Sequence, residues 1–298
     1  MREKEMGKKK QSLLYSAGIA ALLSTIWSVG TAHATSQPID ISDRVESAVE
    51  AVQEGLEILW PEGFPKEDFS FRLGIGTGFT PDYVGSDNYR LRFLPILEVK
   101  YKDVWRLNGT KLSYTAISRG HFEAGPLINY RFGRSESQNK ALRGLGNISD
   151  TVEVGGFIQY RTKKMLLNAD FRQALGASQG QTLRLTVGHG ILKKGPFFMG
   201  VGARAKIMNK KGMQTNFGIT QQQSDQSEYG FTPYEAKAGF SEVSGNVVAG
   251  YRLNENARIV SLLSVGRLLN GAKNSPLVTS GTGSKYQIIA GTAITFSF

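Results

Sequence analysis

The sequence predicts an all-β protein: a transmembrane antiparallel β-barrel, with 12 strands expected and 10 as the fallback, after a short N-terminal periplasmic helix. Three observations predict it. The chain opens with an export signal. It is rich in glycine, with 35 Gly in 298 residues, and 10% of it is aromatic. Its later part alternates apolar with small or polar residues over segments of about 10–13 residues, and a tilted strand needs about 9–11 to cross a bilayer.

The composition excludes several classes of protein. Without cysteine there is no disulfide, zinc-thiolate site or Cys nucleophile. The formal net charge of +11 falls only to +8 when the five Lys/Arg and two Asp/Glu of residues 1–34 are removed. Nucleic acid is not expected as a partner, because the chain is exported. The acidic phosphates of lipopolysaccharide, or cell-wall polymers, are the expected neighbours.

Residues 1–34 are interpreted as a signal peptide. A basic start precedes a mostly apolar stretch from Leu13 to Val29, and Ala32-His33-Ala34 supplies small residues where a signal peptidase reads. We expect cleavage after Ala34. The alternative is an uncleaved membrane anchor.

Residues 35–68 form a separate N-terminal arm. One apolar stripe at three- and four-residue steps predicts a helix from Asp43 to Leu59, with Ser42 as its N-cap and Trp60-Pro61 as its end. We favour a helix that packs on whatever follows; the alternatives are an arm that docks a partner or plugs the barrel mouth. The stripe is Ile41, Val45, Ala48, Val52, Leu56 and Leu59.

Residues 69–298 are predicted to be the barrel. From Phe69 to Phe79, bulky apolar residues alternate with Ser, Arg and Gly, and the pattern returns until Phe298. The face with glycine and isolated charges suits a crowded lumen, while the bulky face suits lipid. Aromatic residues cluster near strand ends, as at a membrane interface.

The connections predict the strand count, because short turns lie on the periplasmic side and long loops outside. Strict alternation requires a reversal within 104–117, which Asn108-Gly109 supplies. This gives 12 strands with both termini in the periplasm. Short turns are expected at 102–103, 118–120, 162–163, 193–195 and 254–256, long connections at 81–88, 133–150, 208–238 and 270–284, and a medium one at 175–180.

Several motifs resemble one family. The stretch from Thr80 to Arg90, TPDYVGSDNYR, is similar to the signature APDYEGSDDYR of the MipA/OmpV family, the MltA-interacting proteins. The stretches YRFGR (130–134), LRGLG (142–146) followed by DTVE (150–153), and MQTNFGI (213–219) also resemble family motifs in the same order. The signature residues are Pro81, Asp82, Tyr83, Gly85, Ser86 and Asp87, in the first outer loop.

The resemblance implies a barrel in the outer membrane of a Gram-negative bacterium, in contact with lipid and lipopolysaccharide. It implies a scaffold linking a lytic transglycosylase to a murein synthase. We expect the arm and the short turns to be the contact surface of such a scaffold. The alternatives are a porin-like channel for small solutes, anions among them, and an adhesin acting through 208–238. The aromatic terminus at Phe296 and Phe298 is the signal expected by the barrel assembly machinery.

No catalytic, cofactor or metal residue is predicted. One glycine-rich stretch, residues 74–78 (GIGTG), has the spacing of a dinucleotide-binding loop. No helix is expected after it, so that function is not predicted. His121 near Glu123 and the isolated His189 form no metal-spaced cluster, and Asp82 with Asp87 favours a turn over a cation site.

The predicted lumen carries charges. We favour a sealed, ion-paired interior over an anion-preferring pore, because buried charges need partners and 12 strands make a narrow barrel. The charges are Arg72, Arg90, Arg92, Glu98, Arg131, Glu153, Arg161, Asp170, Arg172, Arg184, Arg204, Lys206, Glu242 and Arg252.

Overall fold

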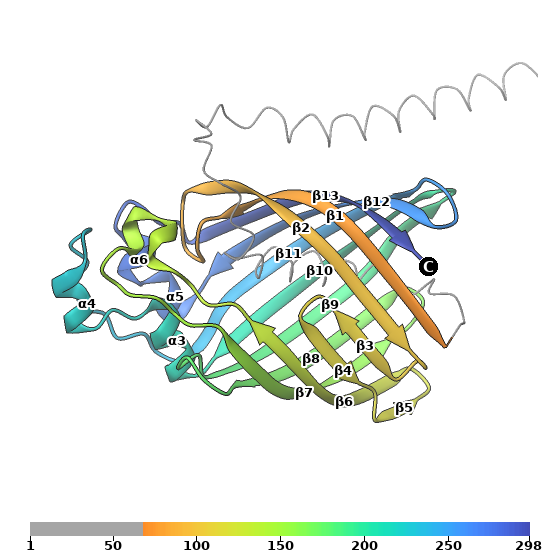
Figure 1. The fold of residues 1–298 in the computed structure, drawn as a ribbon, viewed down its shortest axis with the longest axis horizontal. Helices are drawn as coiled ribbons and strands as arrows, with labels where there is room; N and C mark the ends of the chain where they lie inside the picture. Colours follow the sequence, from red (N-terminus) through yellow and green to blue (C-terminus); the bar gives the residue numbers. More distant parts are fainter. Residues whose placement is uncertain (1–67) are drawn as a thin grey trace, which may run out of the picture. The chain divides into compact units, whose positions relative to one another are not determined.

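The computed structural model describes residues 68–298; the predicted signal peptide and the predicted arm helix lie outside them. The described part is one antiparallel sheet that closes into a barrel (Figure 1). No helix within it is long and apolar enough to cross a membrane. Its strands are β1 (Phe69–Pro81), β2 (Tyr89–Tyr101), β3 (Trp105–Asn108), β4 (Lys111–Tyr114), β5 (Ile117–Arg119), β6 (Phe122–Arg131), β7 (Thr151–Arg161), β8 (Met165–Ala174), β9 (Gln181–Lys194), β10 (Phe197–Met208), β11 (Gly239–Arg252), β12 (Ala257–Leu268) and β13 (Tyr286–Ser297).

The barrel has 12 strands around its wall, as predicted. The sheet runs from β4 through β3, β2, β1 and β13 down to β5, and a pairing of β4 with β6 closes it. β4 and β5 both pair with β6 and are two pieces of one barrel strand, interrupted at Thr115 and Ala116. The first and last long strands, β1 and β13, lie side by side from Arg72↔Ser297 to Phe79↔Ala290.

The predicted reversal at Asn108-Gly109 is displaced by one residue. Asn108 still pairs with Lys111 in the β3–β4 ladder, so the turn consists of Gly109 and Thr110. Only Gly109 has a positive φ, +57°. Asn108 remains in the ladder, and the left-handed position of the two-residue turn falls on Gly109, which adopts a positive φ without the steric cost of a side chain.

The connections alternate as predicted. Short turns join β2 to β3, β5 to β6, β7 to β8, β9 to β10 and β11 to β12, and long loops follow β1, β6, β10 and β12. The start of β1 and the C-terminus lie at the short-turn end, where Phe71 and Phe298 exchange backbone hydrogen bonds. This end is therefore the periplasmic end.

The two faces of the wall differ in chemistry. Along β1 the apolar odd-numbered positions are mostly exposed, with Ile75 61% exposed, while the alternate Arg72 is fully buried. The same parity continues around the barrel, where Ile158 of β7 is 62% exposed between half-buried Phe157 and buried Gln159. An outer surface of this kind is the belt that hydrocarbon requires.

The short β3–β4 hairpin leaves one strand edge without a sheet neighbour. Within residues 68–298, β2 pairs with β3 only from Glu98 to Tyr101. The carbonyl of Leu97 accepts from Gly109 at the hairpin tip, and Pro95 lies on the same edge two residues beyond it. Proline has no N–H to leave unpaired, so it suits this position.

The long loops contain the helices: η1 (Glu136–Gln138), η2 (Lys140–Leu142), α3 (Lys210–Phe217), α4 (Gln221–Gln226), α5 (Asn270–Lys273) and α6 (Pro276–Thr279). They gather at the outer end of the barrel (Figure 1). Asn209 caps α3 by accepting from Gly212, and Thr220 and Gln223 form a capping box on α4.

Candidate functional site

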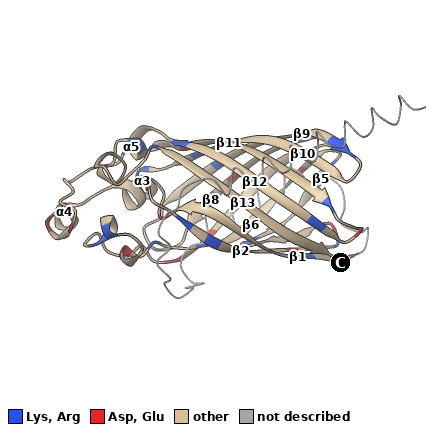
Figure 2. Ribbon diagram, turned by 90° about the horizontal axis from the view of Figure 1, so that it is seen from above, with Lys and Arg blue, Asp and Glu red and all other residues tan. Residues whose placement is uncertain are grey.

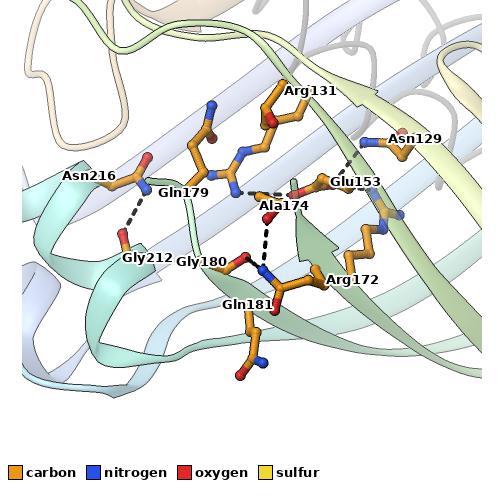
Figure 3. Close-up of polar contacts among 12 residues, drawn as sticks. Asn129, Arg131, Glu153, Arg172, Ala174, Gln179, Gly180, Gln181, Gly212 and Asn216 are labelled. Carbon is orange, nitrogen blue, oxygen red and sulfur yellow. Dashed lines mark hydrogen bonds and ion pairs between the residues drawn. The ribbon is translucent and has the colours of Figure 1, made fainter. Parts of the chain in front are cut away.

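The lumen contains a buried ion-pair network on β6, β7 and β8 (Figure 3). Glu153 accepts from Arg131 Nη1 at 3.2 Å and from Asn129 Nδ2 at 3.0 Å, and Arg172 Nη1 lies 3.7 Å from its second oxygen. Arg172 Nε also donates to Asp170 at 2.6 Å. These side chains are at most 4% exposed. Two cations and two carboxylates thus balance inside the wall, as buried charges require.

A second buried pair joins the strands where the chain begins and ends. Arg72 of β1 donates to Glu98, directly opposite on β2, and its Nε donates to Ser297 of β13 at 3.2 Å. One guanidinium therefore ties three neighbouring strands together.

The other predicted lumen charges lie in three environments. Arg184 is 1% exposed and stands opposite Asp170 in the ladder, while Arg161, Arg204, Lys206 and Glu242 are partly buried. Arg90 and Arg92 turn toward the outer loops, where they donate to the carbonyls of Gln138 and Asp82. Arg252 keeps the inward parity of β11 but is exposed at the periplasmic rim, because the strand ends there.

The first outer loop is anchored by its own motif. Asp82 accepts from Arg90 and from Asn139 Nδ2 at 2.9 Å. The buried Tyr83 hydroxyl donates to the carbonyls of Leu277 and Thr282 at 3.2 and 3.3 Å. Burial raises the pKa of Tyr83 to about 12. The contacts of Asp82 are those of a structural carboxylate.

Gly85 and Ser86 of this motif let the first outer loop lie close against the last outer loop and β13. Gly85 has φ +102°, and a Cβ there would lie 2.8 Å from Val278 Cγ2. Its N–H donates to Gln287 of β13, and buried Ser86 accepts from the N–H of Asn88. Pro81 ends β1, and Asp87 is exposed.

The four long loops pack into one folded cap over the outer mouth. One apolar cluster contains residues from all four loops. A second cluster lies beside it and includes residues of α3 and α5. Gln223 donates to the carbonyl of Leu145, and Arg134 to that of Asn216. Desolvation lowers the pKa of Arg134 to about 10. The first cluster is Tyr83, Ala141, Leu142, Leu145, Ile219, Phe231 and Leu277.

A cavity of about 100 Å³ lies beneath this cap. Basic side chains predominate around it, and two carboxylates accompany them. The charged residues lining it are Asp82, Arg92, Arg131, Arg134, Lys206 and Glu242.

The lumen also has an apolar sector, which was not predicted. Its residues face inward from β2, β11, β12 and β13, with Phe198 of β10 against them. The sequence signal was a loss of alternation, as in the unbroken run from Phe93 to Leu97, which is typical of a strand buried on both faces. The sector consists of Leu94, Ile96, Val248, Val260, Leu262, Ile289 and Ala293.

A family model for MltA-interacting protein MipA matches residues 73–298. The chain belongs to the MipA family. No curated protein matches it. Solved structures to which it is similar include the NanC porin (10% identity, 75% of this chain and 98% of that one, TM-score 0.40). The CymD monoaromatic hydrocarbon channel is another (12% identity, 78% and 90% covered, TM-score 0.39), as is the COG4313 outer membrane channel from Pseudomonas putida F1 (9%, 80% and 100%, TM-score 0.38).

The MipA-family chain is an outer-membrane protein of the Gram-negative type. A closed barrel with an apolar outer belt, short turns at one end and long loops at the other is the architecture of that membrane. Both aromatic residues of the predicted C-terminal signal, Phe296 and Phe298, are exposed on the outer face, and the Phe298 ring stacks on Phe71 at 4.9 Å.

The histidines of this MipA-family barrel are separate from each other. His121 lies exposed at the β5–β6 turn against the Tyr160 ring, and His189 is exposed on β9. Glu123 accepts from Gln159. Within residues 68–298, no group of three His, Asp or Glu residues could hold a metal ion.

Proposed function

We propose that this MipA-family protein is a non-enzymatic anchor that holds murein enzymes, a lytic transglycosylase and a murein synthase, at the periplasmic face of the outer membrane. The observation that carries the proposal is the charge of the periplasmic rim. Exposed basic residues stand on four of its turns and on the end of β11, and Figure 2 shows basic positions at the strand ends beside the C-terminus. They are Lys102, Arg119, Lys163, Lys164, Lys193, Lys194 and Arg252.

The acidic residues exposed at the same rim are fewer. Among residues 68–298 they are Asp68, Asp103 and Glu255, and Asp103 pairs with Lys100. A rim of one predominant sign steers and orients a partner of the opposite sign. The family description, MltA-interacting protein, supports a murein enzyme as that partner.

The outer end of the barrel differs from the periplasmic rim, and this difference supports the anchoring role. Its loops bury Met213, Phe217 and Phe231 within the cap. The segment 208–238, the predicted adhesive loop, thus buries its large apolar side chains apart from Tyr229, whereas the periplasmic turns are short.

The test is binding of purified transglycosylase to the detergent-solubilised full chain. Reversal of Lys163, Lys164, Lys193 and Lys194 to Glu should weaken binding at least tenfold. The matched control reverses four exposed lysines of the cap: Lys140, Lys211, Lys237 and Lys273. Equal binding by both variants would refute the rim as the contact surface, and no binding by the parent chain would refute the anchoring role.

A further inference from the structure

A shallow trough of about 880 Å³ crosses the lipid-facing wall of the barrel. It follows two neighbouring rows of cross-strand partners, whose side chains take the outward positions of β6 to β13. The second row ends at the pair Arg267↔Tyr286 of β12 and β13. The first row includes Tyr160↔Leu167↔Val187↔Ala203↔Gly245↔Val265.

Small residues form the floor of this trough. The outward positions on β10 and β11 are Ala203, Ala205 and Gly245, and a Cβ at Gly245 would meet nothing within 4 Å. On the flanking strands β9 and β12 the outward neighbours are Val187 and Val265, which are 43% and 48% exposed. The wall is therefore hollowed between two rims of larger apolar side chains, and it leaves room for an apolar chain from the surrounding lipid.

The trough extends from one membrane surface to the other. Because the strands are tilted, a row of cross-strand partners rises along the wall. This row begins at Phe122 and Tyr160, beside the periplasmic turns, and ends at Tyr286, where the last outer loop enters β13. Strands lie about 4.8 Å apart, so the row from β6 to β13 is about 34 Å long, against an apolar band about 25 Å tall. Its outer end therefore reaches the headgroup level of the outer leaflet.

Two cations lie together at that outer end. Cζ of Arg267 is 5.7 Å and Nζ of Lys285 is 5.5 Å from the ring centroid of Tyr286. All three residues are exposed, and among residues 68–298 neither cation forms an ion pair with a carboxylate. Two like charges beside one ring repel each other, and an anion that contacts both relieves this repulsion. Arg and Lys are the side chains that bind phosphate.

We propose that this trough binds lipid A, the phosphorylated and acylated part of lipopolysaccharide. A phosphate lies on Arg267 and Lys285 at the outer end. One acyl chain follows Val265, Gly245 and Ala203 toward the membrane centre. The inference is independent of the anchoring role, because it concerns the lipid-facing wall and not the periplasmic rim.

A second copy of the chain suits the trough less well. Every copy is inserted in the same orientation, so a two-fold contact at this wall brings the cations of both copies to the same height. Like charges that face each other across an interface oppose association. The charge at the outer end therefore favours an anionic lipid over a second barrel.

Retention of lipid A by the detergent-purified full chain, measured by native mass spectrometry, tests the phosphate contacts. The double variant Arg267→Gln with Lys285→Gln should retain at least tenfold less lipid A than the parent. The parent should show the same loss with lipid A from which the phosphates have been removed. The matched control is Lys140→Gln with Lys211→Gln, two exposed lysines of the cap, and should bind as the parent does. Equal retention by the parent and the double variant, or an equal loss in the control, would overturn the proposal.

Filling the trough tests the acyl chain. Gly245→Phe and, separately, Ala203→Phe should each lower lipid A retention at least fivefold, with the heat-modifiable gel band showing that the barrel has folded. The control is Ala249→Phe, at an outward position of β11 outside the trough, and should leave retention unchanged. Unchanged retention in both trough variants would overturn the acyl-chain position. A dimeric parent that these variants convert to a monomer would assign the trough to a second copy and overturn the lipid site.

Discussion

The hydroxyl of Tyr83 donates to the carbonyl of Leu277, 194 residues later in the chain, at 3.2 Å. The two residues belong to the first and last outer loops and share one buried cluster with residues of the other two. This contact links the family motif to the closure of the outer mouth.

Replacement of Tyr83 should therefore destabilise the loop cap more than the barrel wall. Tyr83→Phe removes the hydrogen bonds and should cost about 1 kcal/mol, while Tyr83→Ala also empties a core position and should cost about 3–5 kcal/mol. Limited trypsin digestion at the loop lysines measures the opening of the cap. Cleavage at the same rate in all three proteins would contradict this role.

The same residue predicts an alkaline transition. The pKa of Tyr83 is raised from 10.0 to about 12, so its contribution to stability is fully present below pH 10 and lost as the pH rises through 12. A shift of this size is worth about 2–3 kcal/mol. Urea unfolding between pH 9 and 12 should show this loss in the parent chain but not in Tyr83→Phe, which serves as the control for the other tyrosines.

Removal of the central carboxylate should destabilise the barrel wall. Glu153→Gln leaves Arg131 and Arg172 short of their shared acceptor, and breaking a buried pair in this way costs about 3–5 kcal/mol. The control is Glu228→Gln, which breaks a pair with Arg143 whose side chains are 48% and 61% exposed, and should cost less than about 1 kcal/mol. Urea midpoints in lipid vesicles compare them; equal midpoints would argue against the network.

The alternate glycines of β1, Gly74, Gly76 and Gly78, should not tolerate a methyl group. In Gly76→Ala the new Cβ would lie 2.5 Å from Ala293 Cβ and 2.6 Å from the carbonyl of Thr292, so β1 and β13 would have to separate. Gly245→Ala, on β11, meets nothing within 4 Å and is the matched control. Loss of the heat-modifiable band on gels is expected for the first variant only.

The sequence by itself determined the wall of this protein. A period of two assigns each side chain to lipid or lumen, so the inward Arg72 and the outward Ile75 were predictable from their positions alone. The alternation of short turns and long loops then required the hairpin at Gly109 and gave 12 strands.

Only the tertiary structure decided which inward groups meet. The pairing of Glu153 with Arg131 and Arg172 depends on the register of three strands, which periodicity does not supply. The apolar sector around Leu94 gathers residues from four strands, and the cap joins Tyr83 to Leu277, 194 residues later in the chain. Parity is a local property of the backbone, whereas these contacts exist only once the sheet has closed.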